Sequence, residues 1–188
     1  MPLSSLTIGN FSCKDPSATA MISGVLANAG TTTPTPTPNP NPNPGPALPA
    51  GGVNSGNAGD LRWGEVYFAP YVDMAAWPVP DLRQIATARG VSLLTLGFIQ
   101  ATPEGAPAWA GLPALGLAAT NDQAVAINQS IRGFQQAGGD VMVSLGGAAG
   151  TSLAQWYAAH GRTAAELAQA YASIVDAYSL NRMDFDIE

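Results

Sequence analysis

The clearest pattern in the chain is the stretch Asn181-Arg182-Met183-Asp184-Phe185-Asp186-Ile187-Glu188. Apolar and acidic residues alternate along it, and a period of two is that of a β-strand with unlike faces. One face of the predicted strand, residues 183–187, would carry the apolar side chains Met183, Phe185 and Ile187. The opposite face would carry three acids in a row, Asp184, Asp186 and Glu188.

The acidic row predicts carboxyl chemistry. Same-face neighbours on a strand lie about 6.6–7 Å apart, so buried carboxylates in this row would repel one another unless one kept its proton. A carboxyl group that stays protonated near neutral pH can act as a general acid. The alternative is a solvated strand end with no role, but the apolar reverse face favours a row that points inward.

The composition of the 188-residue chain excludes several other functions. Seven Lys and Arg residues are too few for a nucleic-acid-binding face, and the apolar runs are too short to span a membrane. Cys13 is the only cysteine, which excludes an internal disulfide and a thiolate zinc site. His160 is the only histidine, which disfavours a Ser-His-Asp triad and a His-rich metal site. The chain has 13 Asp and Glu residues, so its composition favours chemistry carried out by carboxyl groups.

The first 61 residues divide into two segments. Residues 1–30 have two interpretations: a signal peptide with an A-x-A-like site at Ala27-Asn28-Ala29, or the remnant of an upstream module. Residues 31–61 begin with alternating prolines in a Thr, Pro and Asn-rich run, which predicts a disordered, extended linker. The linker is either a tail without function or a tether between modules, and the Thr-Pro repeats favour an extracellular chain.

Strands and helices alternate in residues 62–188. We expect strands at 66–72, 91–99, 141–145 and 183–187, and a loop at 100–120. A first helix is expected from Leu82, between an N-cap at Asp81 and a stop at Gly90. The other helices are expected at 122–137 and from the capping box Thr163-Ala164-Ala165-Glu166 to Tyr178.

This order predicts an α/β fold with a parallel sheet, either doubly wound or a (β/α)₈ barrel. No G-x-G-x-x-G follows the first strand, which disfavours a dinucleotide-binding fold. Residues 62–188 are about half of the roughly 250 residues of a barrel, so we expect strands 1–4 of an incomplete TIM barrel. The acids after the fourth strand would then lie at the barrel's C-terminal mouth, where active sites form.

Three segments resemble glycoside hydrolase family 18, the chitinase family. The family signature D-x-x-D-x-D-x-E is matched by residues 181–188, and its third-strand motif S-x-G-G by Ser144-Leu145-Gly146-Gly147. The opening strand, residues 67–73, also resembles bacterial chitinases. The resemblance covers residues 64–188, and Asn181 departs from the first acid of the signature.

The resemblance implies hydrolysis of chitin or N-acetylglucosamine oligosaccharides by retaining, substrate-assisted catalysis. Glu188 would be the general acid, and Asp186 would orient the acetamido group of the substrate, whose own oxygen is the nucleophile. Asp184 would share a proton or a hydrogen bond with Asp186, supported by Ser144. The remaining substrate-binding candidates are Tyr71 and Phe98, which could stack on sugar rings, and Gly146 and Gly147, which let the backbone pack close to the site.

Several other residues have less specific interpretations. Trp77 could also stack on a sugar, and its alternative is core packing. Asp73 and Gln100 could form hydrogen bonds with a sugar, and their alternative is a surface position. Trp109 and Trp156 are expected in packing roles, and His160 at the end of a helix.

The resemblance implies a secreted hydrolase that needs no metal or organic cofactor, binds no nucleic acid or membrane, and is monomeric when full length. Two alternatives remain open: a chitin-binding, lectin-like barrel without catalysis, and an endo-β-N-acetylglucosaminidase acting on N-glycans. Because half a barrel leaves open sheet edges, we expect residues 1–188 to be a fragment that is poorly folded and inactive alone.

Overall fold

The computed structural model describes residues 7–12, 63 and 66–186. The strands are β1 (Thr7–Ser12), β2 (Tyr71–Asp73), β3 (Leu93–Ala101), β4 (Pro107–Trp109), β5 (Asp140–Gly146) and β6 (Arg182–Asp186). The helices are α2 (Leu82–Arg89), the 3₁₀ turn η2 (Pro113–Leu115), α3 (Asp122–Gln136), α4 (Leu153–Ala159) and α5 (Ala164–Tyr178). The predicted linker and Glu188 lie outside the described residues, as does most of the 1–30 segment.

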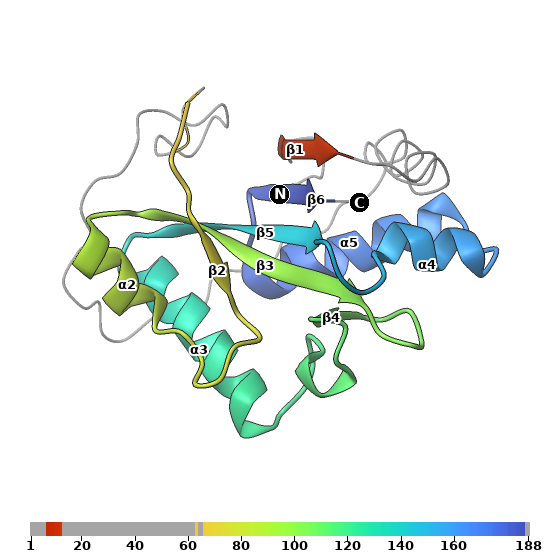
Figure 1. The fold of residues 1–188 in the computed structure, drawn as a ribbon, viewed down its shortest axis with the longest axis horizontal. Helices are drawn as coiled ribbons and strands as arrows, with labels where there is room; N and C mark the ends of the chain where they lie inside the picture. The colour runs from red at the N-terminus through yellow and green to blue at the C-terminus, as the bar shows by residue number, and fades with distance from the viewer. Residues whose placement is uncertain (1–6, 13–62, 64–65, 187–188) are drawn as a thin grey trace.

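One sheet organises the described residues, with the strand order β1-β6-β5-β3-β2. All neighbours in this order pair in parallel, and the short strand β4 pairs antiparallel to β3 beside it. The strands β2, β3, β5 and β6 are therefore adjacent in chain order (Figure 1). A doubly wound sheet reverses its strand order part-way, and these four strands do not.

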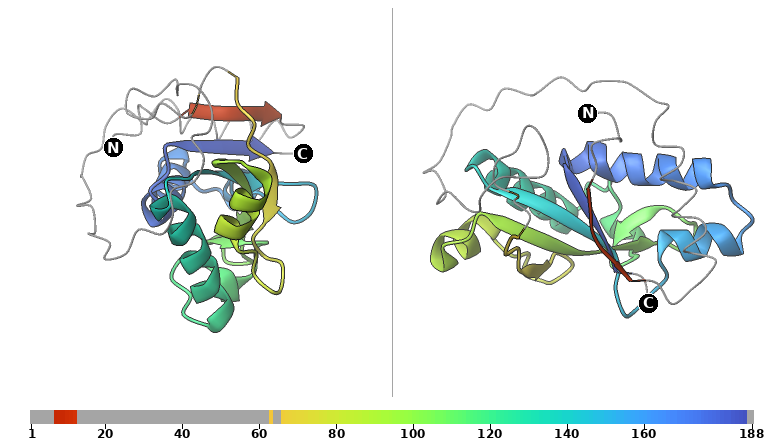
Figure 2. Two further views of the ribbon diagram at one scale, coloured as in Figure 1. Left: turned by 90° about the vertical axis from the view of Figure 1, so that its left-hand side faces the viewer. Right: turned by 90° about the horizontal axis from the view of Figure 1, so that it is seen from above.

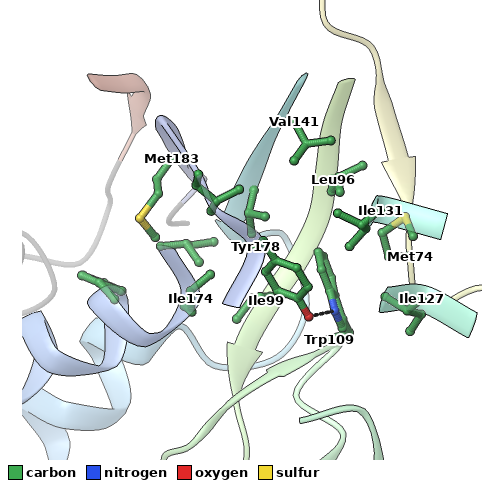
Figure 3. Close-up of a cluster of buried hydrophobic side chains, with 14 of the residues drawn as sticks. Met74, Leu96, Ile99, Trp109, Ile127, Ile131, Val141, Ile174, Tyr178 and Met183 are labelled. Carbon is green, nitrogen blue, oxygen red and sulfur yellow. Dashed lines mark hydrogen bonds between the residues drawn. The ribbon is translucent and has the colours of Figure 1, made fainter. Parts of the chain in front are cut away.

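Helices α2, α3 and α5 cover the same face of the sheet. Buried residues of α2, α3 and α5 belong to one hydrophobic cluster with alternate residues of β3, β5 and β6. Figure 3 shows Ile127 and Ile131 of α3 and Ile174 of α5 converging on strand residues such as Val141. The predicted α/β fold with a parallel sheet is thus confirmed, and its helices lie on one side.

Local sequence signals set the helix boundaries as expected. Asp81 caps α2 by accepting a hydrogen bond from the Gln84 N–H, and Gly90 ends this helix in the left-handed conformation. Thr163 and Glu166 form the predicted capping box of α5. The apolar stripe predicted for α3 is buried, and it consists of Ala124, Ile127, Ile131 and Phe134.

The structure differs from the prediction in the first strand and in the segment predicted as a loop. Residues 66–70 are not part of β2, because Pro70 has no N–H to donate and Val66 and Phe68 are exposed. The segment predicted as a loop, 100–120, holds β4 and η2. Trp109 of β4 is buried, and burial of its indole outweighs the turn-like Pro and Gly content around it.

Two further elements were not predicted. Helix α4 precedes α5 in the crossover from β5 to β6, and Ser152 and Gln155 form its capping box. Strand β1 pairs with β6, with Thr7 opposite Arg182 and Ser12 opposite Asp186. Figures 1 and 2 show β1 running along β6. Within the described residues, none of the helices is long and apolar enough to span a membrane.

Candidate active site

The predicted alternation of β6 is confirmed for its described residues. Met183 and Phe185 are buried in the helix-facing cluster, and Phe185 packs edge-on against Tyr171 of α5. Asp184 lies on the opposite face of the strand and is fully buried. We call the group formed by Tyr71, Ser144, Asp184 and Asp186 the acid site.

Asp184 is held by hydroxyl groups from two other strands. The Tyr71 hydroxyl of β2 donates to Asp184 Oδ2 at 2.6 Å, and the Ser144 hydroxyl of β5 donates to the same oxygen at 2.7 Å. Ser144 lies directly opposite Asp184 in the pairing of β5 and β6. Two hydroxyl donors therefore take the place of water around this buried carboxyl group.

Burial and the contact with Asp184 together raise the pKa of Tyr71 to about 12. Partial burial of the phenol is the largest cause, followed by its hydrogen bond to Asp184 and the negative charge of Asp184. The charge of Asp186 acts in the same direction. Tyr71 thus stays a hydrogen-bond donor throughout the physiological range, although half of its side chain is exposed.

Phe98 and the glycines of the Ser144-Leu145-Gly146-Gly147 motif border the acid site. The Phe98 ring stacks on Tyr71 with a centroid distance of 5.8 Å. A Cβ atom at Gly147 would lie 3.1 Å from the Phe98 ring, so this glycine allows the backbone to approach the ring closely. The Gly147 N–H donates to the carbonyl oxygen of Asp186 at 2.7 Å.

The predicted site residues therefore come together in part. Tyr71, Ser144 and Asp184 are joined by hydrogen bonds, and Phe98, Gly146 and Gly147 lie next to them. Asp186 is partly buried and pairs opposite Gly146. Glu188 lies outside the described residues, so its predicted role as acid stays a prediction. Among the residues described, no three of the His, Cys, Asp and Glu side chains cluster as a metal site requires.

The less specific candidates take other positions. The Gln100 amide is buried and donates to backbone carbonyl oxygens, and Asp73 accepts from the Ala75 N–H. The Trp77 side chain is 70% exposed. The packing roles predicted for two other tryptophans are confirmed: Trp109 donates to the buried Tyr178 hydroxyl, and Trp156 donates to the Pro103 carbonyl.

His160 is the C-cap of α4, which confirms its predicted place at the end of a helix, although the range of that helix was not predicted.

A second polar cluster lies on the same sheet face, at the N-terminal ends of the strands. The Trp63 indole donates to Asp140 Oδ2 at 2.6 Å, and the Arg182 guanidinium lies 5.1 Å from the centre of the Trp63 ring and 5.6 Å from that of Tyr67. We call these four residues the basal cluster. Sequence analysis did not predict it, because a buried Arg and a buried Asp leave no periodic signal.

Comparison with known proteins shows what the chain is similar to. No family model matches the chain. It is 36% identical over 128 residues to the probable bifunctional chitinase/lysozyme of Escherichia coli, and 37% identical over 126 residues to endochitinase 11 of Metarhizium anisopliae. Its fold matches the catalytic domain of a Pyrococcus furiosus chitinase with a TM-score of 0.53 and 32% sequence identity.

The chain resembles chitinase catalytic domains. The predicted resemblance is thereby confirmed over a part of each protein. The matches cover 67% of this chain but only 13% and 22% of the two curated relatives, and 63% of this chain but 36% of the P. furiosus domain. A structure of the P. furiosus domain carrying catalytic-site mutations and bound chito-oligosaccharides matches equally well.

Proposed function

We propose that this chain supplies the first four strands of a (β/α)₈ barrel of the family 18 type, which hydrolyses β-1,4-linked N-acetylglucosamine polymers. The chain order of β2, β3, β5 and β6 and the single helix-covered face support a singly wound barrel. The chitinase relatives support chitin as the substrate class. The Thr-Pro repeats of the linker support a secreted protein, and we propose that the whole protein acts as a monomer.

One observation carries the proposal: a fully buried aspartate accepts hydrogen bonds from two hydroxyls at the sheet end where barrels place their active sites. Burying a carboxyl group costs free energy, and the hydroxyls of Tyr71 and Ser144 offset that cost. An arrangement of this kind, on three different strands, is unnecessary for packing and suits a positioned acid–base row.

In the proposed mechanism, three carboxyl groups act together: Asp184 and Asp186 of β6, and Glu188, which follows them in the sequence. Glu188 protonates the leaving glycosidic oxygen. The acetamido oxygen of the substrate attacks the anomeric carbon and forms an oxazolinium ring. Asp186 accepts a hydrogen bond from the acetamido N–H and stabilises the positive charge. Asp184, fixed by Tyr71 and Ser144, sets the orientation and charge of Asp186.

We further propose that residues 1–188 alone do not turn over chitin. The matched segment is 36% of the P. furiosus catalytic domain, so the remaining strands of a barrel would come from outside this match. The outer edge of β2, with Tyr71 and the neighbouring Phe68 exposed, would then be covered by a further strand.

The test uses a hybrid domain, in which residues 63–188 of this chain replace their counterparts in the P. furiosus catalytic domain. We expect the hybrid domain to hydrolyse chito-oligosaccharides. The variant Glu188→Gln should lower kcat by about 10²–10⁴-fold, as expected for loss of a general acid, while oligosaccharide binding persists. The matched control is Glu166→Gln, because Glu166 lies at the start of α5 and glutamine also completes a capping box.

The outcomes separate the candidate functions. Near-normal rates in the Glu188→Gln hybrid would disprove the assignment of the acid. A folded hybrid that binds chito-oligosaccharides without cleaving them would favour the lectin-like alternative. Cleavage of N-glycans in preference to chitin oligomers would favour an endo-β-N-acetylglucosaminidase.

A further inference from the structure

A glycine-rich loop follows β5 and borders the acid site. We call residues 146–150 the glycine loop. Gly146, Gly147 and Gly150 have φ angles of 106°, 87° and 81°, a region that L side chains rarely adopt. Glycine gains this freedom at an entropic cost, so a loop with three such residues needs contacts from elsewhere to hold one conformation.

The side chain of Gln100, near the end of β3, supplies those contacts. Gln100 is 8% exposed, and its Nε2 donates to the Gly146 carbonyl oxygen at 2.7 Å and to the Ala149 carbonyl oxygen. A Cβ atom at Gly150 would overlap the amide, with its Cδ at 2.7 Å, so the loop backbone lies directly against it. The neighbouring Ala101 N–H donates to the Thr151 carbonyl at 2.9 Å, which fixes the end of the loop to the same strand.

The glycine loop in turn contacts the acid site. The Gly147 N–H donates to the Asp186 carbonyl oxygen, and Gly146 lies opposite Asp186 in the strand pairing. On its other side, Gly147 lies against the Phe98 ring, which stacks on Tyr71. Any shift of the loop would therefore move the backbone of Asp186 and the ring that supports Tyr71.

We propose that Gln100 is a positioning residue: its buried amide fixes the glycine loop, and the loop fixes Asp186 and Phe98 for catalysis. The inference rests on the proposed function for its catalytic consequence, while the loop contacts stand on the structure alone. Gln100 does not donate to a sugar, because both hydrogens of its Nε2 are engaged by backbone carbonyls. Its amide is bordered by Gly111, Gly146, Ala149 and Gly150, none of which ionises.

The test is Gln100→Glu, which keeps the shape of the side chain and makes its donor titratable. An ionised glutamate would direct one acceptor oxygen, in the place of Nε2, at both carbonyl oxygens. A protonated glutamate can donate to one of them. In the hybrid domain we expect kcat at pH 7.5 to fall at least about tenfold. The ratio to wild-type kcat should rise again as the pH is lowered toward 5, because protonation restores a donor.

The matched control is Gln135→Glu. The Gln135 Nε2 also donates to a backbone carbonyl, that of Tyr178 at 2.7 Å, but it lies on α3 away from the acid site. This variant should leave the ratio to wild-type kcat independent of pH. Equal pH-dependence in both variants, or wild-type kcat in Gln100→Glu at pH 7.5, would overturn the proposal.

A second measurement is independent of activity. Amide hydrogen exchange of residues 146–152 is followed in the whole 188-residue chain and in the hybrid domain, corrected for the intrinsic effect of pH. Gln100→Glu should raise exchange about tenfold at pH 7.5 and less at pH 5, and Gln135→Glu should not. Unchanged exchange in this loop would contradict the role of Gln100. If the unmutated hybrid folds but does not cleave chito-oligosaccharides, the proposed function is wrong. The amide exchange of residues 146–152 then still tests whether Gln100 fixes the glycine loop.

Discussion

The acid site and the basal cluster lie on one face of the same sheet, and both contain a buried aspartate. Asp140 of the basal cluster accepts hydrogen bonds from the Trp63 indole and from the Val141 N–H, and the buried Arg182 guanidinium lies over the Trp63 ring. Asp184 of the acid site instead accepts from two hydroxyls, one of them on a half-exposed tyrosine. The basal cluster closes its end of the face with aromatic rings, whereas the acid site leaves its end accessible.

The difference indicates that a buried carboxyl group is not by itself a sign of catalysis. Asp140 is buried with the large side chains of Trp63 and Arg182, which suits a structural role. Asp184 instead contacts the small side chain of Ser144 and the half-exposed Tyr71. A second acid, Asp186, follows on the same face of β6 and is partly buried. The predictions below test this contrast between the two ends.

The largest contrast should come from matched Asp→Asn changes. In the hybrid domain, Asp184→Asn should lower kcat by about 10²–10⁴-fold, because the charge that controls Asp186 is lost. Asp140→Asn should leave kcat within about twofold, since an asparagine oxygen can still accept from Trp63. Steady-state kinetics with a chito-oligosaccharide measure both. Similar losses in the two variants would show that the basal cluster also serves catalysis.

The second contrast concerns stability. Trp63 is fully buried, so Trp63→Ala should lower the free energy of unfolding by about 3–5 kcal/mol. Trp77 is 70% exposed, and Trp77→Ala should change stability by no more than about 0.5 kcal/mol. Urea denaturation of the hybrid domain measures both values. A large loss in Trp77→Ala would mean that its indole packs against a part of the domain outside the described residues.

A smaller effect is expected for Ser144→Ala. Removing this hydroxyl takes one donor from buried Asp184, which should cost about 1–3 kcal/mol of stability. Ser173→Ala is the matched control, because the Ser173 hydroxyl donates to the Ala170 carbonyl within α5 and touches no charge. Urea denaturation should show the larger loss in Ser144→Ala, and equal losses would contradict a stabilising hydrogen bond between Ser144 and Asp184.

The smallest effect should appear only at high pH. Tyr71 keeps its proton to a pKa of about 12, above the ordinary value of 10.0. Between these values the folded protein holds a proton that the unfolded chain has lost, so this contribution is complete below pH 10 and disappears as the pH rises to 12. Stability should therefore fall more steeply over this range in the wild type than in Tyr71→Phe. Parallel curves for the two proteins would rule out the Tyr71–Asp184 contact.

The sequence predicted the parts of the fold that periodic patterns specify. The alternation of Met183 to Asp186, the stripe of α3 and the caps of α2 and α5 depend on local chemistry, and the structure confirms them. Strand β1 and the basal cluster could not be predicted, because their partners are distant in the sequence and no period links them. Helix α4 carries a capping box, Ser152 with Gln155, that could have been found.

The candidate site was predicted residue by residue, but its connections were not. Sequence motifs named Tyr71, Ser144 and Asp184, yet only the strand order shows that the two hydroxyls meet at one carboxyl oxygen. Gln100 was weighed as a sugar contact, because a polar residue at a strand end is often exposed. The structure buries it against the glycine loop, a contact that depends on the pairing of β3 and β5.

The hydrogen bond between Trp109 and Tyr178, shown in Figure 3, has a practical meaning for redesign. This hydrogen bond joins β4, in the segment after β3, to the last turn of α5. Helix α5 is followed by β6, the strand that carries Asp184 and Asp186. Anyone grafting new substrate-facing segments onto this scaffold should therefore leave Pro107–Trp109 intact and insert at Leu112, whose side chain is half exposed. Replacing the whole segment from Pro107 to Leu115 would remove this hydrogen bond between β4 and α5.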